Sequence, residues 1–365
     1  MSGALIQLVS KGIQDVYLTH NEGHSFFKMK FARHTNFSQS PKLIKTITDK
    51  DMSIQIPVLG DAVNAIWLQG TEKLMDMFYK STIDLFIGGQ KIDSQDFDYY
   101  ADIWSNYLAD TFSKTKEMNN KASSTNSGFI PLHFFFCNHN SFLPLVALQN
   151  HQVELRITFD PETVNTIPED KKKVEIYGNY IFFDKEEREG IVKRSMDFVI
   201  TQVQKHEHPL NTADGYNTID LSHFNHPVKS LFFGFSSTDR VYDADYFKFT
   251  GADLYINGTP LFENMKPVYF HTVQNYYKSE YGITDYDVAQ DIPFYTRYFT
   301  YHFCLNASQY NPSGTCNFSR LDNAKLTIRG ATVAPDRVGE PIYIYAVNYN
   351  VLRIKDGLAG ILFGN

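Results

Sequence analysis

One segment near the end of the chain, Ile342 to Ile354, is apolar on both faces of the strand that it predicts. Alternate residues of a strand point to opposite faces, so a strand of this kind is covered on both sides, by a second sheet and by something else. One face would carry Tyr343, Tyr345, Val347, Tyr349 and Val351, and the other Ile342, Ile344 and Ala346. The preceding segment, Ala324 to Gly330, alternates simply and predicts a half-buried strand. The chain must therefore fold in layers of β-sheet.

Strand patterns recur through most of the sequence, and 15% aromatic residues favour them. The clearest alternation is QVELRITFD, and Asn257-Gly258 between apolar runs predicts a hairpin. Tyr100, Ile103, Trp104 and Tyr107 instead follow helical spacing, with acidic residues near the helix start. The predicted strands are Ser25–Thr35, Ser53–Val58, Ile83–Ile92 with a bulge or turn at Gly88-Gly89, Ile130–Phe136, Gln152–Asp160, Val174–Asp184, His223–Phe235 and Tyr295–Leu305, and the predicted helix is Asp96–Phe112.

The length of 365 residues favours two domains or one large β unit. Lys185 to Glu189 reads as a charged connector, and near Ser195 to Pro209 the chain is expected to cross to a second unit. The chain is thus predicted to be all-β, with two antiparallel sandwiches and short helical insertions. The pattern alone leaves a jelly roll and an immunoglobulin-like sandwich open.

Charge and cysteine content narrow the classes of function. The net charge is −7 and no basic stripe is visible, so direct binding of nucleic acid is not expected. Three cysteines argue against a disulfide framework and fit a reducing compartment. No apolar run reaches the roughly 18 residues that a membrane-spanning helix needs.

No catalytic, metal or cofactor site is predicted. His206-Glu207-His208 could chelate a metal, but a site needs three or four converging ligands. An acidic loop at Asp239, Asp243 and Asp245 lacks the spacing of an EF-hand and is interpreted as a solvated loop. The N-glycosylation sequence Asn-x-Ser/Thr occurs at Asn36, Asn257, Asn306 and Asn317; at Asn317 a structural hydrogen bond is the preferred interpretation.

Two long strings near the end of the chain carry a resemblance to a known family. The first is Asn311-Pro-Ser-Gly, followed by Asn317-Phe-Ser-Arg and Asp322; the second is YAVNYNVLRI from Tyr345 to Ile354. Together they resemble the major capsid proteins of the nucleocytoplasmic large DNA viruses, in particular those of algal viruses (phycodnaviruses) and related lineages. Further matching segments occur in order along the chain: Phe26–Phe37, the Gly88-Gly89-Gln90 strand with the helix after it, Pro131–Phe136, Ala147–Arg156 and His223–Phe235.

The resemblance implies two consecutive eight-stranded antiparallel jelly-roll sandwiches: an arm over residues 1–20, a first domain over 21–195 and a second over 196–365. It also implies a structural protein without enzyme activity or cofactor. Three copies would form a pseudo-hexagonal capsomer that tiles an icosahedral shell. The expected partners are neighbouring capsomers, minor capsid and penton proteins, and an inner membrane beneath the shell. The expected location is the virion, after assembly in the host cytoplasm.

The chain departs from the family pattern in two places, and alternatives remain. It is shorter than typical members in the loops of the outward tower, and Ala62 to Ser81 fits poorly. A minor capsid paralogue of the same fold is therefore an alternative. A carbohydrate-binding or glycosidase β-sandwich would need exposed aromatic platforms and paired carboxylates. Only two tryptophans are present, and Trp104 lies in the predicted helix. A penton protein is disfavoured by the doubled pattern.

Overall fold

The computed structural model describes most of the chain, and its contacts divide the chain into two units, residues 1–36 and 37–365. Every sheet of the described residues lies in the second unit. The predicted arm apart from Ile13, most of the strand Ser25–Thr35 and the acidic loop of Asp239 lie outside the described residues. The described residues are 33–50, 52–111, 128–138, 140–213, 215–235, 247–280, 298–333 and 338–364, together with Ile13 and Lys114.

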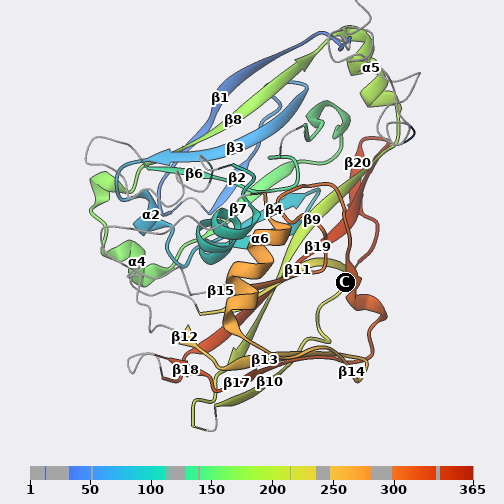
Figure 1. Cartoon of the computed structure of the whole chain (residues 1–365). Coiled ribbons are helices and arrows are strands. Elements are labelled where there is room, and N and C mark those ends of the chain that lie inside the picture. The colour runs from blue at the N-terminus through green and yellow to red at the C-terminus, as the bar shows by residue number, and fades with distance from the viewer. Residues whose placement is uncertain are drawn as a thin grey trace, which may run out of the picture. The chain divides into compact units, whose positions relative to one another are not determined.

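The first sandwich consists of two four-stranded antiparallel sheets (Figure 1). One sheet has the order β1 (Phe37–Ile47), β8 (Val174–Phe183), β3 (Ala62–Gly70) and β6 (Phe129–Pro131). The other has the order β2 (Ser53–Gln55), β7 (Val153–Thr158), β4 (Thr82–Ile87) and β5 (Gln90–Asp96).

The second sandwich repeats this arrangement with later strands. Its first sheet has the order β9 (Met196–Pro209), β19 (Pro341–Lys355), β11 (Pro227–Gly234) and β15 (Tyr298–His302). Its second has the order β10 (Tyr216–Asp220), β17 (Ala324–Arg329), β13 (Gly251–Ile256) and β14 (Thr259–Met265). The short strands β16 (Cys316–Asn317) and β20 (Leu358–Ile361) extend the first sheet, at β11 and β19, while β12 (Phe247–Lys248) and β18 (Thr332–Val333) form a separate two-stranded sheet.

Both sandwiches have the same topology. When only the eight main strands of each are counted in chain order, both pair their strands as first-eighth-third-sixth and second-seventh-fourth-fifth. This is the jelly-roll arrangement of two Greek keys. It confirms the predicted pair of consecutive jelly rolls and excludes the immunoglobulin-like alternative.

Short helices occupy the connections between strands. Asp160 and Asp184 cap two of them, because their carboxylates accept the backbone N–H of Thr163 at 3.1 Å and of Glu187 at 2.8 Å. The helices are α2 (Leu74–Met77), the π-helix η2 (Asp98–Leu108), η3 (Leu145–Ala147), α4 (Pro161–Asn165), η4 (Glu169–Lys171), α5 (Lys185–Lys193), the π-helix η5 (Tyr269–Val273), α6 (Gln274–Lys278) and η6 (Phe318–Arg320).

Several predicted elements are confirmed. Strand β7 alternates between buried and more exposed residues, as QVELRITFD predicts. Asn257 and Gly258 both have positive φ, 50° and 78°, and form the turn of the β13–β14 hairpin. Gly88 and Gly89 also have positive φ and connect β4 to β5. The predicted helix is present as η2.

Other predictions were wrong for local reasons. The predicted strand over Ile130–Phe136 ends at Pro131, because the chain then turns, and the N–H of Cys137 donates to the carbonyl of Phe134 at 2.8 Å. Val58 is exposed although Ile54 and Ile56 are buried, since β2 ends at Gln55.

The expected connectors are regular elements. Lys185–Glu189 begins helix α5, which Asp184 caps and Lys193 ends, an arrangement that suits the helix dipole. The crossing at Ser195–Pro209 is strand β9, which pairs with β19 along its whole length. The sequence does not reveal this strand, because most of its residues are polar. A half-exposed strand needs few apolar residues.

The sheet containing β19 is buried on both faces, as its sequence predicts. Ile342, Ile344 and Ala346 face the core of the second sandwich. Tyr345 and Val347 belong to the core cluster of the first sandwich. One face of β19 is therefore covered by the other sheet of its own sandwich, and the opposite face by the first jelly roll.

Candidate functional site: the joint between the sandwiches

The joint is defined here as the contact of β5 and η2, from the first sandwich, with the outer face of the sheet β9-β19-β11-β15. Helix η2 places Tyr107 in the centre of the joint. The buried ring of Tyr107 lies 5.7 Å from the ring of Phe232 and 6.4 Å from that of His271. Its hydroxyl donates a hydrogen bond to the carbonyl of Tyr298. Burial raises the pKa of Tyr107 above its ordinary value, so the hydroxyl stays a donor.

Two carboxylates at the start of η2 accept hydrogen bonds from the second sandwich. Asp96 accepts the Tyr345 hydroxyl at 2.7 Å and pairs with the ammonium of Lys205 at 3.0 Å. Asp98 accepts the Tyr298 hydroxyl at 2.8 Å. Burial disfavours the charge of Lys205, but the two carboxylates outweigh it and raise its pKa. Asp96 also accepts the N–H of Tyr99, so its predicted place at the helix start is confirmed.

A third carboxylate, Asp93, is buried where β5 meets β9. It accepts the backbone N–H of Val203 at 2.8 Å, the side-chain amide of Gln95 at 2.8 Å and the N–H of Ser94 at 2.9 Å. Burial raises its pKa to about 6, although these donors act in the opposite direction. The joint thus combines aromatic packing with directed hydrogen bonds, and it fixes one sandwich against the other.

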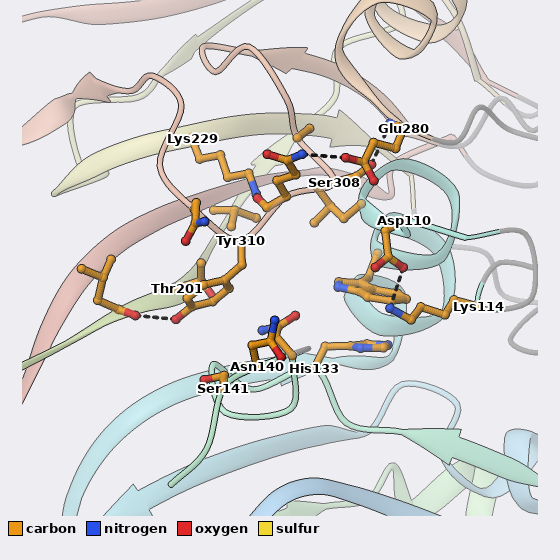
Figure 2. A pocket seen from close by; sticks show the side chains of 18 of the residues that line it. Asp110, Lys114, His133, Asn140, Ser141, Thr201, Lys229, Glu280, Ser308 and Tyr310 are labelled. Atoms are coloured by element: carbon orange, nitrogen blue, oxygen red, sulfur yellow. Dashed lines mark hydrogen bonds and ion pairs between the residues drawn. The ribbon is translucent and has the colours of Figure 1, made fainter. Parts of the chain in front are cut away.

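Beside the joint lies a cavity of about 640 Å³ (Figure 2). Residues of both sandwiches line it, among them His133 and Trp104 from the first and Lys229 and Tyr310 from the second. The rings of Trp104 and His133 are stacked with centroids 3.5 Å apart. Burial lowers the pKa of His133 to about 3, so this imidazole is neutral at physiological pH.

Lys229 reaches the cavity from an irregularity in β11. The register with β19 shifts between Val228 and Ser230, and the intervening Lys229 is buried. Its ammonium donates to the carbonyl of Gln309 at 2.8 Å and lies 5.9 Å from the ring centre of Tyr349. Burial lowers its pKa to about 8. No carboxylate within the described part of the chain forms an ion pair with it.

Replacing Lys229 with methionine is therefore expected to raise the free energy of unfolding at pH 7, by about 1–2 kcal/mol. The lowered pKa means that folding disfavours the ammonium by about 3 kcal/mol, and loss of the bond to Gln309 offsets about 1–2 kcal/mol of the gain. The benefit should shrink as pH rises from 8 towards 10.5, because the folded wild type is then neutral at this position. Urea unfolding at several pH values measures it. The exposed Lys355→Met variant is the control, and a Lys229→Met chain less stable than wild type at pH 7 would contradict the expectation.

The residues singled out as potential metal ligands are not brought together into a site. His206 and His208 lie on β9, and the ring of His206 is 3.9 Å from that of His223. Burial lowers the pKa of His206, and the neighbouring histidines add to this. Among the residues that the structure describes, no group of three or more potential ligands is close enough to hold a metal ion. No helix of the described chain is long and apolar enough to cross a bilayer.

The four glycosylation sequences occupy different surroundings. Asn36 is exposed, and the exposed Asn257 accepts the N–H groups of Asp322 and Asn323 at 3.0 and 3.1 Å. Asn306 is partly buried and donates to Glu280 at 3.0 Å. Asn317 accepts the N–H of Ser319 at 3.1 Å at the start of η6, which confirms its structural hydrogen bond. Glycosylation at any of the four stays a prediction.

Models of protein families match both halves of the chain. The model described as major capsid protein N-terminus matches residues 25–184, and the model described as large eukaryotic DNA virus major capsid protein matches residues 187–360. The major capsid protein of Pyramimonas orientalis virus is 31% identical, and that of Paramecium bursaria Chlorella virus 1 is 29% identical. Both alignments cover 100% of this chain and 100% of the relative.

Solved structures share the fold. The PBCV-1 virus capsid model superposes with a TM-score of 0.76 at 24% identity, over 93% of this chain and 100% of that one. The Faustovirus major capsid protein gives a TM-score of 0.66 at 10% identity, over 95% of each chain. The similarity in sequence and in fold thus extends over both sandwiches and the joint.

Proposed function

This chain belongs to the major capsid protein family of large eukaryotic DNA viruses, and on that premise we propose that three copies associate into a capsomer that tiles an icosahedral shell. Its role is structural, in the capsid of the virion, and its family is not one of enzymes.

The observation that carries the proposal is the repeat of one topology in two sandwiches that contact each other within one chain. Each copy supplies two sandwiches with the same strand order. The joint buries Tyr107, Phe232 and Tyr345 and engages Asp93 in hydrogen bonds between the sandwiches. Three such copies present six similar walls, which is the number that a hexagonal tile requires. A closed ring of identical chains is the usual form of a soluble assembly.

We place the arm over residues 1–20, the first jelly-roll domain over 21–195 and the second over 196–365. The proposed partners are neighbouring capsomers, minor capsid and penton proteins and a membrane beneath the shell, with assembly in the host cytoplasm. The net charge of −7 supports a shell that does not bind the genome directly.

Light scattering after size exclusion tests the assembly state. We expect a stable species with about three times the chain mass of 42.0 kDa. The measurement should be repeated across a hundredfold range of concentration, since association follows mass action. A strict monomer at every concentration would count against the trimer.

A further inference from the structure

The two sandwiches carry equivalent helical insertions. Helix η2 follows β5, the fifth main strand of the first sandwich, and η5 with α6 follows β14, the fifth main strand of the second. Both insertions contain π-helix, a rare form. Tyr107 lies 11 residues after the end of β5 at Asp96, and Tyr276 and Tyr277 lie 11 and 12 residues after the end of β14 at Met265. The pair Tyr276-Tyr277 therefore occupies the place of Tyr107 in the second insertion.

Tyr107 and the pair Tyr276-Tyr277 have opposite surroundings. Tyr107 is buried against the outer face of the sheet β9-β19-β11-β15, where it contacts Phe232. Tyr277 is 75% exposed, and its neighbour Tyr276 is 78% exposed. Their rings form an edge-to-face pair with centroids 5.0 Å apart. The insertion of the second sandwich therefore presents an aromatic pair that the described part of its own chain does not cover.

The equivalent sheet of the first sandwich, β1-β8-β3-β6, presents a matching surface. Its outer face carries a row in which Leu43 lies opposite Tyr177, and Tyr177 lies opposite Trp67. The rings of Trp67 and Tyr177 stack at 5.7 Å, both side chains are partly exposed, and Leu43 is 46% exposed. In the second sandwich the corresponding strands β11 and β19 place Phe232 opposite Tyr345, and η2 covers that pair.

We propose that Tyr276 and Tyr277 of one copy pack on the Leu43-Tyr177-Trp67 row of the next copy. The contact repeats between copies the packing that Tyr107 makes within each copy. It is heterologous, because each copy contributes its helix to one neighbour and its sheet face to the other, and three such contacts close into a ring when the rotation between copies is 120°. The inference rests on the proposed trimer and names the surfaces that form it. Exposed aromatic side chains of this kind dominate the energetics of many interfaces.

The first test uses the full-length chain with Tyr277→Ser. We expect the concentration at which the trimer half-dissociates to rise about 10- to 100-fold, as for loss of an aromatic anchor. Tyr216→Ser is the matched control, since Tyr216 is 52% exposed on β10, in the other sheet. Thermal unfolding of each variant verifies folding. A Tyr277→Ser chain that remains as trimeric as wild type overturns this interface alone, whereas a monomeric wild type overturns the proposed function and the interface with it.

A mixing experiment tests the heterologous geometry. Leu43→Arg damages only the sheet face, and Tyr277→Ser damages only the helix face. Each variant alone should be largely monomeric, while their equimolar mixture should form a dimer and stop there, because the pair shares one intact contact. Multi-angle light scattering distinguishes dimer from trimer. Two folded variants that form no dimer on mixing would overturn the proposed pairing of surfaces.

Discussion

Replacing Tyr107 with alanine is expected to lower the free energy of unfolding by about 3–5 kcal/mol, the range for removal of a large buried aromatic side chain. The ring is fully buried between Phe232 and His271, so its loss leaves a cavity in the joint and not at the surface. The carbonyl of Tyr298 loses its hydroxyl partner as well. Chemical denaturation followed by tyrosine and tryptophan fluorescence measures the change.

Tyr107→Phe separates packing from hydrogen bonding. It keeps the ring and removes only the hydroxyl, and we expect a loss of about 1 kcal/mol. If alanine cost no more than phenylalanine, the ring would not hold the joint. We also expect the alanine variant to unfold in two steps, because two sandwiches with separate cores can lose their contact before either melts.

The stability of the chain is expected to fall by about 3 kcal/mol between pH 4 and pH 7 through Asp93 alone. The folded pKa of about 6 exceeds the ordinary 3.8, so the folded state binds the proton more tightly than the unfolded chain. The resulting stabilisation is complete below pH 3.8 and is lost as pH rises through 6. Tyr99, Tyr310 and Asp84 are the titratable neighbours with an electrostatic effect, and Asp84 raises the pKa further.

Asp93→Asn should remove this pH dependence. The amide cannot ionise, so the difference in stability between variant and wild type is expected to change by about 3 kcal/mol from pH 4 to pH 7. Urea unfolding across this range measures it. Asp356→Asn is the control, because Asp356 is exposed and its positive φ of 53° suits asparagine. A constant difference between Asp93→Asn and wild type would show that the carboxyl does not titrate in this range.

The sequence predicts a strand correctly where the hydropathy pattern of its residues reflects which of its faces are buried. Strand β19 is apolar on both faces because both are covered, and β7 alternates because one is. Strand β9 is not predicted in this way, because the polar side chains of Gln202, Gln204 and Lys205 contact other residues through hydrogen bonds and an ion pair. A hydropathy pattern does not detect such contacts. The family resemblance supplies the jelly-roll topology that periodicity leaves open.

The joint could not be derived from the sequence. Asp96 and Asp98 are explained equally well as acidic residues at a helix start, and no local signal pairs them with Tyr345 and Tyr298. Asp93 lies just beyond the predicted strand Ile83–Ile92, and no local signal marks it as buried. Its contact with Val203 depends on the meeting of two sandwiches, which is a property of the tertiary fold.

The pairing of β9 with β19 has a consequence for the order of events during synthesis. Strand β9 leaves the ribosome before the remaining strands of its sandwich, yet its long partner is the last of the eight main strands. Neither the second jelly roll nor the joint can be completed until then, although the first jelly roll can already fold. An unpaired strand edge invites aggregation, and charged side chains discourage it. Asp197, Lys205 and Glu207 on β9 would keep the waiting strand soluble, so a newly made chain becomes competent for shell building only late in its translation.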